Sequence, residues 1–158
     1  MLPSLYKVIQ IASGTLSVMA KPIAGEWLRD EVSGLRKLGV DRLVSLLEVG
    51  EERELGLAEE GALCGEFGIR FTSFPIPDRG VPDTQRAQAL TEALLAEIGQ
   101  GLHIAIHCRA GIGRTGIIAG AVLVAAGYEA SDALELISAA RGVEVPDTAE
   151  QVAWLQAL

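Results

Sequence analysis

The chain has 158 residues, 49% of them apolar, and a mean hydropathy of +0.33, which suits a single domain with one core over residues 1–158. Thirteen Lys and Arg against 21 Asp and Glu give a net charge of −8, and an acidic surface disfavours nucleic acid and anionic membranes as partners. The sequence has neither a secretion-signal pattern nor an apolar run of the roughly 18 residues that a membrane span needs. Its two unlike cysteines indicate no disulfide framework, so we expect a cytoplasmic protein.

Short β-rich runs, each bounded by Gly, Asp or Pro, predict five strands at residues 6–11, 16–19, 42–47, 70–76 and 102–107. Helical patterns fill the gaps and follow the last strand, at residues 26–38, 51–63, 84–98, 115–126, 132–141 and 148–157. Asp147, with Glu150 three residues on, is typical of a capping box before the last helix. The alternation predicts the α/β class, with a central, mostly parallel sheet of about four to five strands and helices on both faces.

One strand end carries side chains suited to chemistry. The apolar strand at residues 102–107 is followed by a six-residue loop, 108–113, which contains two glycines and leads into an apolar helix. Successive backbone N–H groups of such a loop can point to one centre, where the positive end of the helix also points. The sequence therefore predicts a cradle for an anion.

Cys108 and Arg114 bracket this loop with five residues between them. The thiol can lie beneath a bound anion, and the planar guanidinium can bind two phosphoryl oxygens from the side. The cradle also favours the thiolate, so the nucleophile needs no separate base. Thr115 can stabilise the sulfur as a leaving group, and we expect His107 to hold the loop backbone rather than to transfer protons.

The nine residues HCRAGIGRT, from His107 to Thr115, match the pattern H-C-x-x-G-x-x-R-[ST] at every fixed position, and the chain resembles the protein tyrosine phosphatase superfamily. Its size and element order are similar to those of compact dual-specificity phosphatases, and the resemblance extends from about Leu16 onward. It implies hydrolysis of phosphomonoesters through a cysteinyl-phosphate intermediate, without a cofactor. The implied substrates are phosphotyrosine and, in dual-specificity enzymes, phosphoserine and phosphothreonine in proteins. The residues implied in substrate binding are Cys108, Arg109, Ala110, Gly111, Ile112, Gly113 and Arg114.

The resemblance also implies a general acid in a loop upstream of the signature. The segment FPIPDRGVPD, at residues 74–83, is similar to the I-P-D loop of compact dual-specificity enzymes, which favours Asp78. Asp83 is the alternative, and its simpler role is the N-cap of the helix that begins at Thr84. Near the C-terminus, VPDTAEQ resembles the stretch in which relatives place a glutamine that orients the hydrolytic water. Gln151 is therefore a supporting candidate, and its simpler interpretation is a solvent-facing residue in the first helical turn.

Other polar residues have simpler interpretations. His103 and His107 lie four apart on a strand with no third ligand near them in the sequence, so we expect no metal site. Cys64 is typical of a small core residue. The charged run at residues 48–54 is most simply a solvated face.

Three classes of function stay open. The first is a phosphatase for phosphoproteins, and the second is a phosphatase for non-protein phosphoesters such as inositol phosphates. Arg109 matches one basic loop position of inositide-directed relatives, whereas Ile112 leaves the other apolar. The third class is a phosphate-binding module without catalysis, which is disfavoured because the nucleophile, arginine, hydroxyl and acid are all present.

Overall fold

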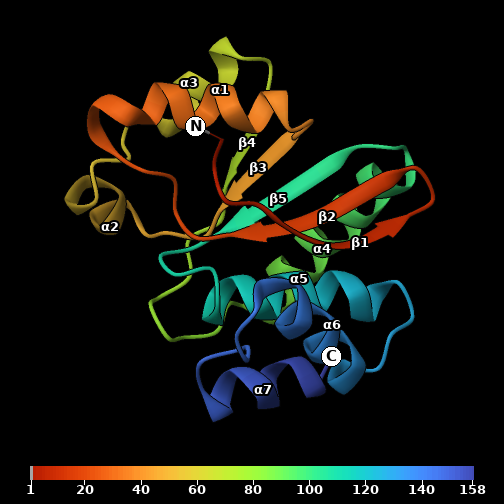
Figure 1. Cartoon of the computed structure of the whole chain (residues 1–158). Helices are drawn as coiled ribbons and strands as arrows, with labels where there is room; N and C mark the ends of the chain where they lie inside the picture. The colour runs from red at the N-terminus through yellow and green to blue at the C-terminus, as the bar shows by residue number, and fades with distance from the viewer. Residues whose placement is uncertain (1) are drawn as a thin grey trace.

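The structure is a computed structural model that describes residues 2–158 (Figure 1). Its strands are β1 (Tyr6–Ile11), β2 (Gly14–Met19), β3 (Arg42–Ser45), β4 (Arg70–Ser73) and β5 (His103–His107). Its helices are the 3-10 turn η1 (Gly25–Trp27), α1 (Leu28–Lys37), α2 (Val49–Glu54), α3 (Glu60–Glu66), α4 (Thr84–Gly99), α5 (Gly113–Ala125), α6 (Ala130–Arg141) and α7 (Ala149–Gln156).

The five strands form one sheet in the order β1-β2-β5-β3-β4. β2, β5, β3 and β4 are parallel, and β1 pairs antiparallel with β2 at one edge, which confirms the predicted mostly parallel sheet. β5 lies in the centre, with His107 opposite Met19 of β2 and Ser45 of β3. The loop that follows β5 therefore leaves the carboxyl edge of the sheet between two other strand ends, where α/β proteins usually bind ligands.

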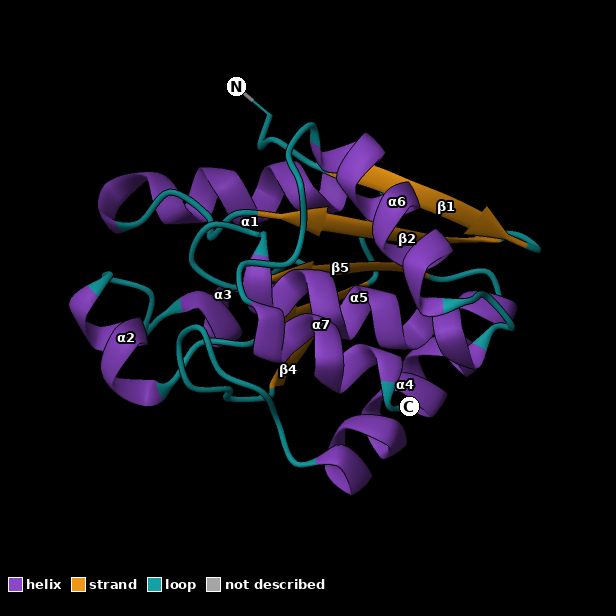
Figure 2. Ribbon diagram, turned by 90° about the horizontal axis from the view of Figure 1, so that it is seen from below, coloured by secondary structure: helices purple, strands orange, loops and turns teal. Residues whose placement is uncertain are grey.

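The helices cover both faces of the sheet, as Figures 1 and 2 show. α1 and α3 lie on one face, and α4 to α7 lie on the other. β5 serves both cores by alternation, because Ile104 and Ile106 pack on the α5 side and Ala105 packs on the α1 side. Cys64 is fully buried in the second core, which confirms its expected packing role. Within residues 2–158, no helix is both long and apolar enough to cross a bilayer.

Two local predictions were wrong. The expected helix over residues 51–63 is two helices, α2 and α3, because Gly56 has φ +72 and ends the first of them in the left-handed region. The capping box of α7 uses Thr148 and Gln151, one residue later than the expected pair of Asp147 and Glu150. The Thr148 hydroxyl accepts from the N–H of Gln151 at 3.1 Å, so the helix begins at Ala149.

Candidate active site

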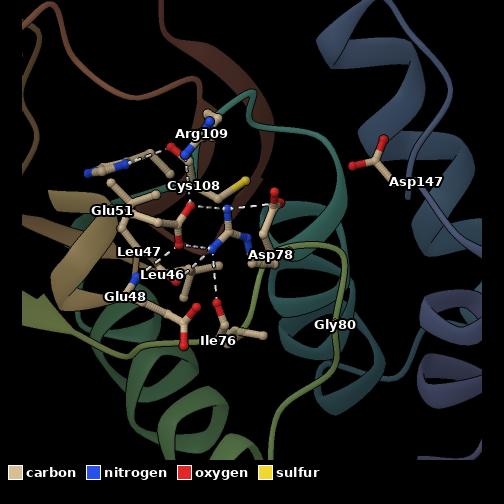
Figure 3. A network of polar contacts seen from close by, with 12 residues as sticks. Leu46, Leu47, Glu48, Glu51, Ile76, Asp78, Gly80, Cys108, Arg109 and Asp147 are labelled. Atoms are coloured by element: carbon tan, nitrogen blue, oxygen red, sulfur yellow. Dashed lines mark hydrogen bonds and ion pairs between the residues drawn. The ribbon is translucent and has the colours of Figure 1, made fainter. Parts of the chain in front are cut away.

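A cavity of about 200 Å³ opens at the carboxyl end of β5. Its lining residues come from the loop after β5, the start of α5, the segment after β4 and the approach to α7: Asp78, Arg79, Cys108, Arg109, Ala110, Gly113, Arg114 and Asp147. Cys108 is 3% exposed and lies beside the polar network of Figure 3. The fold therefore brings the expected nucleophile, arginine and Asp78 into one cavity.

Three consecutive carbonyls of the loop, at residues 108–110, are hydrogen-bonded from outside the cavity. They accept from Nδ1 of His107 at 3.1 Å, from the N–H of Lys21 at 3.1 Å and from Nη2 of Arg141 at 2.9 Å, in that order. In a trans peptide the N–H points away from the carbonyl of the same peptide, so these bonds also fix the amides of residues 109–111. Those amides have no acceptor among residues 2–158, which leaves them available to an anion.

Two glycines of the loop leave no room for a side chain, one against backbone and one against two polar side chains. Gly111 has φ +74, and a Cβ there would lie 2.4 Å from the carbonyl oxygen of Met19, so only glycine fits this position. A Cβ at Gly113 would lie 2.6 Å from Oδ2 of Asp147 and 3.0 Å from Oε1 of Gln151. The signature glycine thus lets the loop pack against the end of β2, and Gly113 admits the segment before α7.

Arg114 is only 2% exposed and is held on several sides. Its Nη1 and Nη2 donate to Oε1 and Oε2 of Glu51 at 2.6 and 3.0 Å, and Nη1 also donates to the carbonyl of Ile76 at 2.9 Å. Nη2 reaches Oδ1 of Asp78 at 3.2 Å (Figure 3). Burial alone would lower the pKa of Arg114, but the hydrogen bond to Glu51 and the charges of Cys108, Glu51 and Asp78 outweigh it, so the pKa is raised.

A guanidinium has two edges that can bind a planar pair of oxygens: Nη1 with Nη2, and Nε with Nη2. Glu51 occupies the first edge of Arg114. Among residues 2–158, the second edge has a single partner, Asp78 on Nη2. This arrangement leaves the second edge for two oxygens of a ligand, provided that Asp78 gives up its contact.

Glu51 belongs to the charged run that the sequence indicates as a solvated face, and this interpretation was wrong for Glu51. It is 11% exposed as a side chain and binds Arg114, and Nη2 of Arg109 lies 3.6 Å from its Oε2. Burial acts to raise the pKa of Glu51, yet the Arg114 hydrogen bond and nearby positive charges lower it overall. The signal in the sequence was slight, because no fixed spacing relates a Glu on α2 to an Arg on α5.

The two candidate acids occupy different environments. The Asp78 side chain is 58% exposed and lies at the cavity beside Arg114. Asp83 is the N-cap of α4, and its Oδ2 accepts from the N–H of Arg86 at 2.9 Å. Asp83 does not line the cavity, so its geometry matches the simpler role of a cap.

Gln151 is fully buried, so the solvent-facing interpretation was wrong. Its Oε1 accepts from the N–H groups of Asp147 and Thr148 at 3.0 and 3.2 Å, and its Nε2 donates to the carbonyl of Gly80 at 3.1 Å. The side chain therefore connects the segment that carries Asp78 to the start of α7. Water orientation by Gln151 stays a prediction, because its amide oxygen already has two donors.

Thr115 and His107 are both fully buried near the nucleophile. The Thr115 hydroxyl has no hydrogen-bond partner among residues 2–158, which leaves it free for the sulfur or for a bound group. His107 holds the loop through the Cys108 carbonyl, as its expected backbone role requires, and its Nε2 lies 2.8 Å from Oε1 of Glu60. The sequence did not indicate Asp147 or Glu60 as site residues: Asp147 was expected only as a helix cap, and no local motif marks Glu60.

Comparisons with known proteins agree with this fold. The crystal structure of kinase-associated phosphatase superposes with a TM-score of 0.88, at 20% identity over 98% of this chain and 93% of that one. Tk-PTP in a mutant form gives 0.75, at 27% identity over 90% and 88%. PTEN1 of Arabidopsis thaliana, a phosphatidylinositol 3,4,5-trisphosphate 3-phosphatase and protein-tyrosine-phosphatase, is 34% identical over 103 residues.

The match to PTEN1 covers 61% of this chain and only 25% of that protein, so the chain spans about a quarter of this curated relative. The family model described as PTP-SAK, the DSP-PTPase phosphatase domain of Swiss Army Knife proteins, matches residues 8–158. This chain therefore belongs to that family and is an enzyme, a phosphatase of the dual-specificity protein tyrosine phosphatase type.

Proposed function

We propose that the chain hydrolyses phosphomonoesters in two steps, through a cysteinyl-phosphate at Cys108. The observation that carries this proposal is the meeting, in one cavity, of a buried cysteine, a free edge of Arg114, the Asp78 carboxyl and a loop whose carbonyls are bonded outward. Both cysteines are free, and Cys108 must stay reduced to act, which supports the proposed cytoplasmic location.

In the first step, the Cys108 thiolate attacks phosphorus and the bond to the leaving oxygen breaks. Asp78, in its protonated form, gives its proton to that oxygen, so the product leaves as a neutral alcohol or phenol. The amides of residues 109–111 and the Nε–Nη2 edge of Arg114 bind the phosphoryl oxygens as they spread in the transition state. Glu51 keeps the guanidinium in place when Asp78 moves from Arg114 to the leaving group.

In the second step, water attacks the phosphorus of cysteinyl-phosphate and the phosphorus–sulfur bond breaks. Asp78, now a carboxylate, takes a proton from the water, and inorganic phosphate is released. The Thr115 hydroxyl donates a hydrogen bond to the departing sulfur, a role that suits a buried hydroxyl without another partner. The first step leaves Asp78 as the carboxylate that the second step needs, and the second step returns a proton to Asp78.

We propose phosphotyrosine-containing proteins as the first substrate class, with phosphoserine and phosphothreonine as the dual-specificity extension. The carboxylates of Asp78 and Asp147 face the same cavity as Arg79 and Arg109, so its charges are mixed. Such a cavity suits a substrate with one phosphate, because a second phosphate group would meet carboxylates. The names of the kinase-associated and tyrosine-phosphatase relatives support this class.

Inositol phosphates and related phosphoesters are the second candidate. Arg79 and Arg109 stand at the cavity, and the Arg109 side chain is 48% exposed, so both can reach a further phosphate. The name of the Arabidopsis relative includes a phosphoinositide substrate. Phosphate release from a panel of phosphotyrosine peptides, phosphoserine peptides and inositol phosphates, compared by kcat/KM, separates the two candidates.

Cys108→Ser tests the covalent mechanism. We expect turnover to fall by more than about a hundredfold, a barrier increase above ~2.7 kcal/mol, because the hydroxyl replaces a reactive thiolate. Phosphate affinity should stay close to that of the wild type, because the loop amides and Arg114 remain. Rapid acid quench with a labelled aryl phosphate should trap phosphate on the wild-type protein. Activity in Cys108→Ser above a hundredth of the wild type contradicts the covalent mechanism.

A further inference from the structure

The carboxylate of Glu60 lies outside the cavity and supports the loop through His107. His107 and Glu60 are 0% and 2% exposed, and Glu60 is the first residue of α3, on the face of the sheet opposite α5. Nε2 of His107 lies 2.8 Å from Oε1 of Glu60, and Nδ1 lies 3.1 Å from the carbonyl oxygen of Cys108. Oε2 of Glu60 has no partner among residues 2–158. One imidazole thus connects a buried carboxyl to the nucleophile's own peptide.

The acceptors fix the number of protons on this pair. A carbonyl oxygen only accepts, so Nδ1 of His107 must carry a proton. The short contact between Nε2 and Oε1 then holds one more proton, either on an imidazolium facing a carboxylate or on a carboxylic acid facing a neutral imidazole. Both forms have a net charge of zero. Loss of that proton would leave Nε2 of His107 and Oε1 of Glu60 as two acceptors facing each other, and the buried carboxylate of Glu60 would have no positive partner.

Among residues 2–158, no Lys or Arg forms an ion pair with Glu60. The groups that face the pair of His107 and Glu60 are Glu52 of α2, Cys64 of α3 and Cys108, and within the described chain Glu60 has no ion-pair partner except His107. Burial and the charge of Glu60 raise the pKa of Cys64 to about 12. Burial, with the charge of Glu60 added, also raises the pKa of Glu52, against an opposing effect of His107. The charge of Glu60 therefore disfavours ionisation of both neighbours, Cys64 and Glu52.

We propose that Glu60 is a positioning residue for the phosphatase reaction, which keeps His107 in the form that donates from Nδ1 to the Cys108 carbonyl. This inference rests on the proposed function of the loop. The carbonyl of Cys108 and the N–H of Arg109 belong to one planar peptide, so the bond from His107 sets the direction of the first cradle amide. Without Glu60, the imidazole can shift its proton to Nε2 and lose the Cys108 carbonyl, and the amide is then free to turn.

Two variants separate this role from simple packing. Glu60→Gln keeps a donor for Nε2 of a neutral, Nδ1-protonated imidazole, so both hydrogen bonds and the zero charge survive. Glu60→Ala removes the partner. We expect Glu60→Ala to lower kcat/KM by about tenfold to a hundredfold, since misplacement of a binding group by about 1 Å costs on that scale. Glu60→Gln should retain most of the activity, and Glu52→Gln, which leaves the pair intact, serves as the control.

Nitrogen NMR of His107 in the wild type tests the same inference without a variant and without turnover. We expect the spectrum at neutral pH to show a proton on Nδ1, because the Cys108 carbonyl can only accept. An unprotonated Nδ1 overturns the proposal, as does wild-type kcat/KM in folded Glu60→Ala. Failure of the covalent mechanism would instead appear as activity in Cys108→Ser, with the His107 spectrum unchanged.

Discussion

Two arginines of this protein bind a glutamate with two hydrogen bonds each, and they differ in the edge that they use. Arg42 binds Glu97 through Nε and Nη2, at 2.5 and 2.9 Å, and gives Nη1 to the hydroxyl of Thr72. Arg114 binds Glu51 through Nη1 and Nη2. The Arg42 pair leaves no free edge, because all three nitrogens have partners.

The difference separates a structural ion pair from a binding site. Arg42 and Glu97 lie at the amino end of the sheet, where β3 begins and α4 ends, and connect these two elements. Arg114 is more deeply buried, with 2% side-chain exposure against 20% for Arg42, yet it lines a cavity and its Nε has no partner among residues 2–158. A charge with such burial and a free edge indicates a ligand, whereas the number of ion pairs alone does not.

The largest expected effect concerns Asp78, the partner of Arg114 that has no counterpart at Arg42. Asp78→Asn should lower kcat by about 10²-fold to 10⁴-fold for a basic leaving group and flatten the basic limb of the pH profile, because proton donation contributes on that scale. The loss should shrink for an acidic aryl leaving group. Asp83→Asn is the control, since Asn caps a helix about as well as Asp. Damage confined to Asp83→Asn would reverse the assignment.

Arg114→Lys tests the arginine that we assign to ligand binding. An ammonium keeps the positive charge but loses the second edge, so we expect kcat/KM to fall by about 10²-fold to 10³-fold. Arg42→Lys is the matched variant and should lower the thermal midpoint while leaving kcat/KM near the wild-type value. Steady-state kinetics and calorimetry on both proteins measure the two effects. Equal kinetic losses would mean that the edge of Arg114 has no special role.

Glu51→Gln removes the negative charge beside Arg114 and keeps a side chain of nearly the same shape there. We expect kcat to fall by about tenfold, because a hydrogen bond to a charged group contributes about 1.5 to 3 kcal/mol and only part of it is lost. KM should change less, since the phosphate still binds the loop amides. Glu52→Gln, one residue along α2, provides the control. Unchanged kcat in Glu51→Gln would show that Arg114 needs no carboxylate behind it.

The smallest effect concerns the structural pair and depends on pH. The hydrogen bond from Arg42 is the main cause that lowers the pKa of Glu97, although burial opposes it. A carboxyl with a lowered folded pKa stabilises the protein above its unfolded value of ~4.3 and loses this effect as pH falls through the folded value. Glu97→Gln should therefore cost about 1 to 2 kcal/mol at pH 7 and much less near pH 2.

Thermal unfolding at the two pH values measures this loss. The exposed pair of Arg29 and Glu66, with side-chain exposures of 58% and 52%, provides a contrast, and Glu66→Gln should change the midpoint little at either pH. A Glu97→Gln loss that is the same at both pH values would contradict the electrostatic account.

The sequence predicted what is contiguous in the chain. The strand, loop and helix from residue 103 to residue 125 follow local rules of apolar alternation, glycine and helix start, so the cradle and Cys108 were predictable. The supports of the cradle come from distant segments: Lys21 after β2, Glu51 on α2, Glu60 on α3 and Arg141 at the end of α6. No spacing rule relates them, because tertiary packing alone brings them together.

Gln151 shows the same limit at a single residue. Its sequence neighbourhood fits an exposed first turn of a helix, but the chain places Gly80 and Asp147 around it, and the amide becomes fully buried. The break between α2 and α3 differs, since Gly56 was visible in the sequence and its left-handed φ is a common use of glycine at a helix end. Gly56 ends the helix although the apolar pattern continues beyond it.

The contact between Asp78 and Arg114 has a consequence for ion selectivity. When Asp78 is ionised, an incoming anion must displace a carboxylate from Nη2, so binding exchanges one negative group for another. A monoanion such as chloride gains little from this exchange, because it offers Arg114 no more charge than Asp78 already does. A phosphate ester dianion offers two charges and a second oxygen for Nε, and the exchange becomes favourable. The ionised form of the site therefore favours a phosphate ester dianion over small monoanions.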